Sequence, residues 1–507
     1  MKFGLFSKTW INQMETSKLP LFDPEQPYFH ISKKYLENSG LRNDKDIILY
    51  SRQMVKDQFK FLNDVVENSK FGWILGCPGT GKSTTTYSIL PYFHKKGWTT
   101  TWFHLYRNEP PACVQLKNGF KFTMNLSHYE DLEEIIVALD SEEKNIVLID
   151  GFTLEEDHKK VLSFCTYWLK KNKTLNRIVI ISSMSVRRKK NMDHDFELNV
   201  EEFFVDSWKI EEYLIAIQDE EFFNSVQENL DANISLDSLK IRDDELIQSK
   251  YYFAGGSSRL MFAYPTKKVI ESLNESIECV GDIIPYIETT IGDTSHDVIN
   301  RLFNIFKTET KKIKSIVSPY ASSQIGIIKG PLIAKKLYES LRKDMNPSMD
   351  GWMLEIWFFA CLRNGGIKLF DKSNHEEDWE TTFLCNFDPK KPPNPQTPTW
   401  LKPEKFNQGG YDAVYVDKPN KTVKFVQITR GDEHSLKINY FYDLMLKFAE
   451  FFETKTLEIY FIVPLKKLMT FESPNNKITG QCLLKQFGWI KGNEKGQVKI
   501  CGIETIE

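Results

Sequence analysis

The segment Gly76–Ser83, with the sequence GCPGTGKS, constrains the fold of this chain more than any other feature. It matches the pattern GxxxxGK[ST] without a mismatch, follows a short apolar run typical of a strand, and opens a helical pattern. Glycines allow the backbone N–H groups to turn toward a phosphate, and the start of a helix adds its positive dipole end. The motif therefore predicts a strand, a phosphate-binding loop and a helix in succession.

This loop predicts a nucleotide site in which each residue type has its own task. Lys82 is expected to reach the β- and γ-phosphates, and Ser83 is expected to ligate Mg²⁺. The other residues expected to surround the phosphates are Gly76, Cys77, Pro78, Gly79, Thr80, Gly81 and Thr84. The sequence has no NKxD motif for reading guanine, so ATP is favoured over GTP as the ligand.

Uninterrupted apolar runs at 145–150 and 177–183 are typical of parallel strands covered on both faces. Because such runs alternate with helical patterns, we predict a parallel α/β sheet, the P-loop NTPase type of core. The first run ends at Asp150, where open parallel sheets place ligand groups, and Asp150 is the predicted catalytic and Mg²⁺-ligating carboxylate. Gly151 follows, where many ATPases of the AAA+ type carry a glutamate, so nucleotide binding is better supported than fast hydrolysis.

The mainly helical pattern of residues 205–300 predicts a helical lid. Within it, the segment YYFAGGSSRL resembles the second-sensor segment of AAA+ and STAND ATPases. That resemblance implies that Arg259 closes on the γ-phosphate of bound ATP. A glycine turn followed by a surface arginine is the alternative interpretation.

The texture of the sequence changes near residue 350, after a weaker pattern at 310–345 that we interpret as a linker. An aromatic helical pattern, two strand patterns, a helix and a further strand predict a smaller α/β unit. We therefore predict an N-terminal segment, a P-loop NTPase core, a helical lid with linker, and a nuclease-like domain, at residues 1–65, 66–210, 211–345 and 346–507.

Polar residues on two adjacent predicted strands indicate a second site. Asp412 lies in GYDAVYVD, and Gln427 and Thr429 share one face of the following strand because side chains alternate. With Glu355 on the upstream helix, this is the layout of the PD-(D/E)xK nuclease fold. In that fold carboxylates hold Mg²⁺ and a lysine positions or deprotonates water. We expect Asp412 and Gln427 to ligate Mg²⁺ and Glu355 to support them.

The second site departs from the usual pattern at two positions. Gln427 stands where a glutamate is usual, and Thr429 stands where a lysine is usual. We expect the role of the lysine to have moved to Lys437, and His434 is a candidate for proton transfer because its pKa is ordinarily near neutrality. An edge hairpin with solvated polar residues is the alternative interpretation.

The ordered motifs ILGCPGTGKS, VLIDG, IISS, DSWKIEEYL, GGSSR, GYDAVYVD and VQITRGDEHSLK resemble two families. These are the Crinkler effectors of oomycetes and fungi and the retrotransposon hot spot proteins of trypanosomes. Both pair a P-loop NTPase with a restriction-endonuclease-like domain, in which a QxT segment and a nearby histidine replace ExK. Gln427, Thr429 and His434 match that segment. The resemblance implies an ATPase acting on nucleic acid, with DNA as the expected partner, often in a nucleus.

Composition limits the remaining function classes. The net charge is −3, so any nucleic-acid surface must be local, and the basic cluster at 186–191 is one candidate. The eight cysteines form no CxxC pair, and no apolar run approaches the roughly 20 residues of a membrane helix, so we expect an intracellular protein without a membrane partner. A homo-oligomer is possible, as ATPases with a sensing lid often form rings.

Two alternatives stay open at this point. A STAND-like nucleotide switch would carry a C-terminal module that binds nucleic acid or protein without cutting. A small-molecule kinase would explain the P-loop, but neither the GGSSR segment nor the second α/β unit.

Overall fold

The computed structural model places the chain in two units, each with its own hydrophobic core. Unit 1 comprises residues 1–231, 254–269 and 289–317, and unit 2 comprises residues 232–253, 270–288 and 318–507. Within these units the structure describes residues 10–19, 21–41, 44–107, 109–139, 141–186, 197–232, 243–288, 300–307, 312–341, 347–404, 408–432, 434–472 and 478–505. The chain passes between the two units several times, and the helix α11 (Thr266–Cys279) begins in unit 1 and ends in unit 2.

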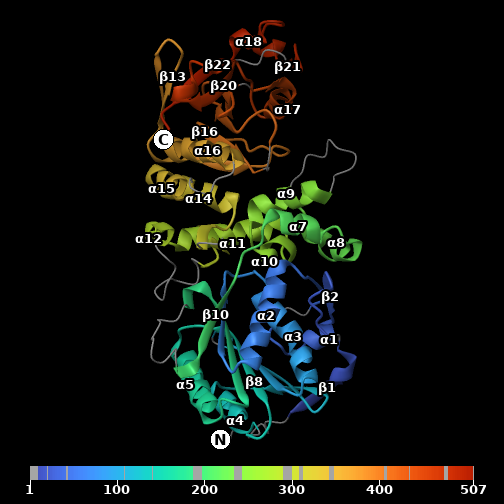
Figure 1. Ribbon diagram of the computed structural model, residues 1–507. Coiled ribbons are helices and arrows are strands. Elements are labelled where there is room, and N and C mark those ends of the chain that lie inside the picture. Colours follow the sequence, from blue (N-terminus) through green and yellow to red (C-terminus); the bar gives the residue numbers. More distant parts are fainter. Residues whose placement is uncertain are drawn as a thin grey trace, which may run out of the picture. The chain divides into compact units, whose positions relative to one another are not determined.

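An eight-stranded sheet forms the centre of unit 1 (Figure 1). Its strands, in spatial order, are β1 (Ile11–Glu15), β7 (Phe120–Asn125), β6 (Ala112–Lys117), β5 (Thr99–His104), β8 (Asn145–Phe152), β9 (Asn176–Ser183), β4 (Phe71–Gly76) and β10 (Val200–Val205). Strands β5, β8, β9, β4 and β10 pair in parallel, whereas β6, β7 and β1 extend the sheet by antiparallel pairing. The predicted parallel sheet is confirmed, and the antiparallel extension is a feature that the sequence analysis did not predict.

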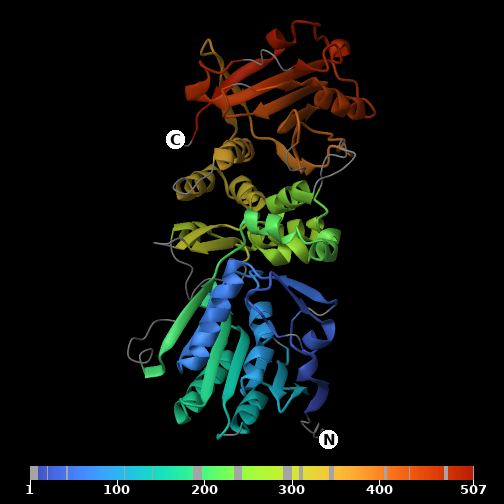
Figure 2. The same ribbon diagram turned by 45° about the vertical axis from the view of Figure 1, so that its right-hand side comes forward.

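Helices cover both faces of the parallel strands (Figure 2). Alternate residues of β8 divide between the two cores, with Ile146 and Leu148 in one and Val147 and Ile149 in the other. This double burial explains why the strand is apolar without alternation. The helices of the first face are α1 (Lys33–Leu36), α2 (Gln53–Glu67) and α3 (Lys82–Lys95), and those of the second face are α4 (Glu130–Val137) and α5 (Glu156–Lys171).

Short elements complete unit 1. They are β2 (Tyr28–Ile31), β3 (Ile47–Tyr50), α7 (Ile210–Ala216), α8 (Glu220–Val226), α10 (Ser258–Phe262), β11 (Phe303–Lys307) and β12 (Lys312–Ile316). Phe262 of α10 packs edge-on against the rings of Tyr213 in α7 and Phe222 in α8, each with ring centroids 5.4 Å apart. These helices therefore share one aromatic core within the unit.

A second eight-stranded sheet forms the centre of unit 2. Its strands, in spatial order, are β14 (Glu376–Trp379), β13 (Ile367–Phe370), β22 (Lys499–Ile503), β20 (Thr456–Pro464), β18 (Thr422–Ile428), β17 (Ala413–Asp417), β16 (Thr399–Pro403) and β15 (Phe383–Phe387). Strands β16, β17 and β18 form an antiparallel meander, and β20 then pairs in parallel with β18. The predicted second α/β unit is confirmed.

Two helices lie on opposite faces of this second sheet (Figure 1). Phe358 of α16 (Pro347–Asn364) packs with Val426 in one core, and Phe441 of α17 (Ile438–Phe448) packs with Phe425 in the other. The remaining helices and short strands of the unit are α9 (Asp243–Ala254), α12 (Ile284–Glu288), α14 (Pro319–Lys329), α15 (Pro331–Leu341), α18 (Glu494–Gln497), β19 (Leu436–Lys437) and β21 (Ile478–Thr479). The aromatic helix predicted upstream of Asp412 is α16.

The predicted linker at 310–345 is wrong over most of its length, because α14 and α15 occupy it. Helix α14 is buried on all sides along most of its length. Its sequence therefore lacks the alternation of a polar and an apolar face that marks a surface helix. The buried residues include Ser322, Ser323 and Gln324, which weaken the apolar pattern that would otherwise indicate a core helix.

Among the described helices, none combines the length and the apolar character that a crossing of the lipid bilayer requires.

Replacing Gly326 in α14 by alanine is expected to destabilise unit 2. The added Cβ would lie 2.4 Å from Cγ2 of Ile356 in α16, and a β-branched side chain within a helix cannot swing away. Overpacking costs about 1–3 kcal/mol, against about 1 kcal/mol gained when alanine replaces glycine in a helix. Urea unfolding followed by tryptophan fluorescence measures the loss.

The matched control is Gly365→Ala, because a Cβ at that position meets no atom within 4 Å. If Gly326→Ala unfolds at the same urea concentration as Gly365→Ala, the close contact between α14 and α16 is contradicted.

Candidate nucleotide site and candidate metal site

The predicted phosphate loop joins the carboxyl end of β4 to the start of α3. Gly79 and Gly81 have φ angles of 77° and 97°, in the left-handed region that glycine adopts without strain. Gly81 is also the N-cap residue of α3, so the loop feeds directly into the positive end of the helix. The local geometry thus follows from the glycine spacing in the sequence.

Lys82 lies inside this loop. Its Nζ donates hydrogen bonds to the carbonyl oxygens of Gly76 at 2.9 Å and Cys77 at 2.8 Å, and the side chain is buried. Burial lowers the pKa of Lys82 to about 8, since the ammonium has lost most of its hydration. Phosphate oxygens would supply the negative charge that this buried ammonium lacks.

Ser83 and Asp150 meet although they are 67 residues apart in the sequence. The Ser83 hydroxyl donates to Oδ1 of Asp150 at 2.7 Å, and Nδ1 of His104 donates to Oδ2 of the same carboxylate at 2.7 Å. The structure therefore brings together the two predicted Mg²⁺ ligands of unit 1. His104, the last residue of β5, was not predicted from the sequence.

Gly151 has a structural reason to lack a side chain. Its φ is 75°, and a Cβ would lie 2.4 Å from the carbonyl oxygen of Leu105. The pairing of β8 with β9 shifts register between Asp150 and Phe152, so the backbone bulges at this point. The backbone of Leu105, which follows β5, thus leaves no room for a glutamate side chain after Asp150. The nearby Glu155 pairs with Arg107 at 3.0 Å.

The GGSSR segment rests on the phosphate loop. Ser258 Oγ donates to the carbonyl oxygen of Gly79 at 2.7 Å, and Ser257 Oγ donates to that of Pro78 at 3.4 Å. A Cβ on Gly79 would lie 2.9 Å from Cβ of Arg259. Arg259 is exposed, and its charge contributes to lowering the pKa of Lys82. The structure therefore places Arg259 beside the loop whose phosphates it is predicted to sense.

Arg52 holds the phosphate loop through a hydrogen bond to its backbone, and it was not predicted from the sequence. Its buried guanidinium donates to the carbonyl oxygens of Thr80 at 3.2 Å and Asp206 at 2.6 Å, and it pairs with Glu212 at 3.1 Å. These partners come from the P-loop, from the end of β10 and from α7. Arg52 has no local motif, so only the folded chain reveals that it joins them.

The second predicted site lies in unit 2 around Asp412. Nε2 of Gln427 donates to Oδ2 of Asp412 at 2.9 Å, and the backbone N–H of Ile428 donates to the same oxygen at 2.6 Å. Asp412 thus sits beside the end of β18, as the spacing of the two predicted strands indicated. The amide oxygen of buried Gln427 has no hydrogen-bond partner.

A lysine from another strand completes this cluster. Nζ of Lys402, on β16, lies 2.9 Å from Oε1 of Glu355 on α16, and the lysine side chain is 7% exposed. Burial by itself lowers the pKa of Lys402, but the nearby carboxylates, Glu355 foremost and then Asp412, help to raise it above its ordinary value. Sequence analysis missed Lys402, whose signal is a charged residue within the apolar run TWLKP.

The cluster holds more acidic groups than basic ones, since Glu355 and Asp412 both lie near the ammonium of Lys402. Burial raises the pKa of Asp412, and the neighbouring carboxylate of Glu355 raises it further. Two carboxylates therefore face one ammonium. Among the described residues no group of three or more His, Cys, Asp and Glu side chains is placed to hold a metal ion. A cation here would bind two carboxylates and the free amide oxygen of Gln427.

The other predicted residues of this site make contacts of their own. Thr429 Oγ1 accepts from the backbone N–H of Gly431 at 3.0 Å, and His434 Nδ1 donates to the carbonyl oxygen of Ser435 at 3.0 Å. Lys437 is exposed and stands at the N-cap of α17. The predicted relocation of the lysine role to Lys437 thus has no support in these contacts, whereas Lys402 contacts Glu355. Apart from its first residue, the basic cluster 186–191 lies outside the described residues.

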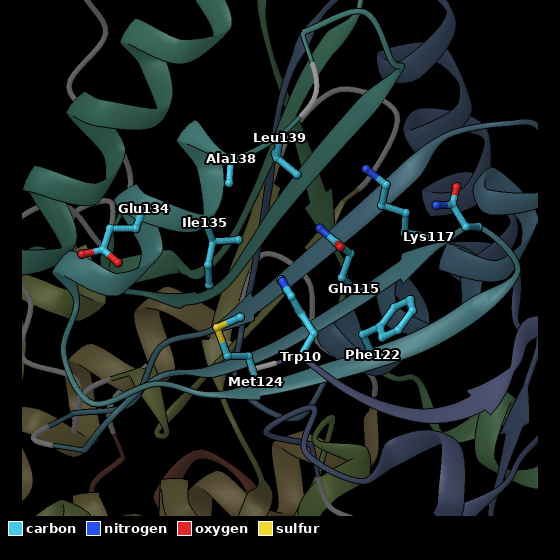
Figure 3. A pocket seen from close by; sticks show the side chains of 10 residues that line it. Trp10, Gln115, Lys117, Phe122, Met124, Glu134, Ile135, Ala138 and Leu139 are labelled. Carbon is cyan, nitrogen blue, oxygen red and sulfur yellow. The ribbon is translucent and has the colours of Figure 1, made fainter. Parts of the chain in front are cut away.

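A separate cavity of about 440 Å³ lies in unit 1 between the antiparallel extension of the sheet and α4. Figure 3 shows side chains of β6 and β7 facing those of α4 across it. The lining residues are Trp10, Gln115, Lys117, Asn118, Phe122, Met124, Glu134, Ile135, Ala138 and Leu139. None of them belongs to the phosphate loop, so the cavity is distinct from the nucleotide site.

The strand order and the loop of unit 1 are those of a P-loop NTPase fold. No protein-family model and no curated protein matches the chain. Among solved structures, RuvB of Thermotoga maritima is 13% identical, with 64% of this chain and 91% of that chain covered and a TM-score of 0.27. Cdc6p of Pyrobaculum aerophilum is 12% identical, covering 57% and 94%, with a TM-score of 0.24. Hsp104 of S. cerevisiae in an ADP complex is 11% identical, covering 66% and 44%, with a TM-score of 0.29. Because these TM-scores are low, the fold assignment rests on the topology and the loop geometry.

Gly151→Glu, which inserts the acid that many AAA+ ATPases carry after the metal-binding aspartate, is expected to lower stability without raising ATP turnover. The side chain would collide with the carbonyl oxygen of Leu105, so the end of β8 must move and carry Asp150 with it. Thermal unfolding and phosphate release measure the two effects.

Gly97→Glu is the control, because Gly97 also has a positive φ of 85° but a Cβ there meets no atom within 4 Å. Both variants incur the left-handed cost of about 1–2 kcal/mol, and only Gly151→Glu adds the collision. Faster turnover by Gly151→Glu at unchanged stability would contradict the steric explanation.

Proposed function

We propose that the chain is an AAA+- or STAND-like nucleotide switch that binds ATP with Mg²⁺ in unit 1 and controls a Mg²⁺-dependent nuclease site in unit 2. The observation that carries the first half is the convergence of Lys82, Ser83 and Asp150 at the carboxyl end of the parallel sheet. These are the groups that phosphate and magnesium require, and they come from separate elements that only this topology unites.

In unit 1 the chain's own residues act by exchanging partners. Lys82 would leave the carbonyl oxygens of Gly76 and Cys77 for phosphate oxygens, and Ser83 would exchange its hydrogen bond with Asp150 for a shared metal ion. Mg²⁺, when bound, neutralises phosphate charge. Since the backbone at Gly151 excludes a catalytic glutamate, slow hydrolysis and a long-lived bound state are the expected behaviour.

In unit 2, Glu355 and Asp412 with the free amide oxygen of Gln427 form a donor set of hard oxygen atoms that suits Mg²⁺ or Mn²⁺. The helix α16, the meander β16–β17–β18, the helix α17 and the parallel strand β20 support the nuclease assignment, because they follow the order of the PD-(D/E)xK core. The metal would supply an activated water and charge neutralisation at a phosphodiester. We propose DNA as the substrate because the chain resembles Crinkler and retrotransposon hot spot proteins.

Assembly into a homo-oligomer and a nuclear location stay predictions of the same resemblances. Light scattering with and without ATP checks the first, and fluorescence microscopy of the tagged chain checks the second.

The alternative is a nucleotide switch whose unit 2 binds nucleic acid or protein without cutting. One observation favours it: Oδ2 of Asp412 already accepts two hydrogen bonds, from Gln427 and Ile428, so part of the carboxylate is satisfied without a metal. A nicking assay separates the two functions.

Lys82→Ala is expected to abolish the rise in melting temperature that ATP and Mg²⁺ produce, because the phosphates lose their buried cation. Differential scanning fluorimetry measures this shift. Lys95→Ala is the control, since Lys95 is an exposed residue at the other end of the same helix. An unchanged shift in Lys82→Ala would remove the nucleotide assignment.

Asp412→Asn is expected to abolish Mg²⁺-dependent nicking of supercoiled DNA while the ATP-induced melting shift stays unchanged. The loss follows because an amide brings no charge to the metal. Asp443→Asn is the control, as Asp443 is exposed on α17 of the same unit. If Asp412→Asn cuts at the wild-type rate, the nuclease site lies elsewhere. Absence of nicking by the wild-type chain would support the binding-only alternative.

A further inference from the structure

We propose that Lys402 is the catalytic lysine of unit 2, reaching the scissile phosphate from β16 instead of from β18. This inference rests on the proposed nuclease function. It names a residue for a role that the sequence leaves vacant, since Thr429 stands at the usual lysine position on β18.

Lys402 reaches the cluster from β16, whereas Gln427 reaches it from β18, two strands away in the sheet. Strand β17, which begins directly after Asp412, lies between β18 and β16 in the sheet. Trp400 belongs to the core beneath α16 and Leu401 to the opposite core, so alternation turns Lys402 toward α16. Glu355 on that helix meets its ammonium at 2.9 Å.

Burial argues that the charge of Lys402 has a purpose beyond packing. A lysine that is 7% exposed has lost most of its hydration, and an apolar side chain of similar volume would fill the space without this cost. Its partners keep the ammonium charged: the Glu355 carboxylate, the ring of Phe359 at 5.3 Å, and the field of Asp412. A charged ammonium beside a metal-suited carboxylate is fitted to bind a phosphate.

A partly buried lysine in the same sheet, with 19% of its side chain exposed, provides the contrast. Lys424 on β18 pairs with Glu377 at 3.1 Å and with Glu458 at 3.8 Å, over the ring of Trp379. These two carboxylates balance the charge of Lys424, whereas the charge of Lys402 acts on Asp412 and lowers its pKa. Lys424 thus lies in an ion network with Glu377, Glu458 and Lys499, whereas Lys402 lies at the candidate metal site.

A second, independent observation points to a ligand at this cluster. The side-chain oxygen of Gln427 is buried without a hydrogen-bond partner, beside Asp412. A divalent cation held by Asp412 and this oxygen would satisfy it. The metal and the Lys402 ammonium would then offer two positively charged groups to one phosphodiester.

The proposed hydrolysis of the phosphodiester needs no reactant other than water. Water forms a bond to phosphorus, the bond between phosphorus and the leaving sugar oxygen breaks, and a proton from the water ends on that oxygen. Lys402 gives up no proton in this step. Its ammonium donates hydrogen bonds to a nonbridging oxygen of the phosphate, where negative charge builds up as the water attacks.

The test compares Lys402→Met, Lys402→Arg and Lys424→Met in the full chain. Two measurements are made: the rate of Mg²⁺-dependent nicking, and the affinity for an oligonucleotide with Ca²⁺ in place of Mg²⁺. Lys402→Met is expected to slow nicking by about 100-fold, the usual effect of losing one charge-stabilising donor, and to weaken oligonucleotide binding about tenfold. Lys402→Arg should recover part of both, and Lys424→Met should change neither although it loses its ion pair with Glu377.

The outcomes separate this inference from the proposed function. Nicking by Lys402→Met at the wild-type rate overturns the inference and leaves the nuclease intact. Equal losses in Lys402→Met and Lys424→Met overturn it also, because a general loss of stability would then explain both. If the wild-type chain does not nick DNA, the nuclease proposal fails, and the affinity measurement decides: unchanged binding by Lys402→Met overturns a phosphate contact, and weakened binding supports it.

Discussion

The alignment of the strand ends at the carboxyl edge of the parallel sheet is the constraint on which the candidate nucleotide site of unit 1 depends, and it brings Ser83 within hydrogen-bond distance of Asp150. It requires α3 to start at the carboxyl end of β4 and β8 to end at the same edge, with β9 between the two strands. Parallel strands buried on both faces meet this requirement, because their ends align while helices fill either side. His104, Arg52 and the GGSSR segment then gather around the edge that this alignment creates.

The same edge limits the chemistry through its backbone. The carbonyl oxygen of Leu105 occupies the space into which a side chain at position 151 would extend, and the bulge between β8 and β9 fixes this approach. Residues suited to phosphate and Mg²⁺ without an acid at position 151 fit the slow hydrolysis proposed for this site. The contact of Ser258 with Gly79 offers a route by which a bound nucleotide would act on the segment that carries Arg259.

Unit 2 follows a different principle, in which buried charges outnumber their partners. Glu355 and Asp412 share one lysine, and burial makes each unmatched charge costly. An amide at position 427 keeps the cluster from gaining a third negative charge while leaving an oxygen free. The arrangement is coherent if a cation or a phosphate completes it, and under the proposed nuclease function Lys402 would supply the positive charge that Thr429 lacks.

The sequence by itself determined the phosphate loop, the parallel strands and the placement of Asp412 near Gln427 on neighbouring segments. Each depends on local rules: glycine spacing, uninterrupted apolar runs, and two successive strands joined by a short turn. The tertiary structure alone decided that His104, Arg52 and Lys402 belong to the sites, and that residues 319–341 are core helices. Those assignments depend on strand order and on which face a distant segment covers, and such nonlocal packing leaves no periodic trace in the residues themselves.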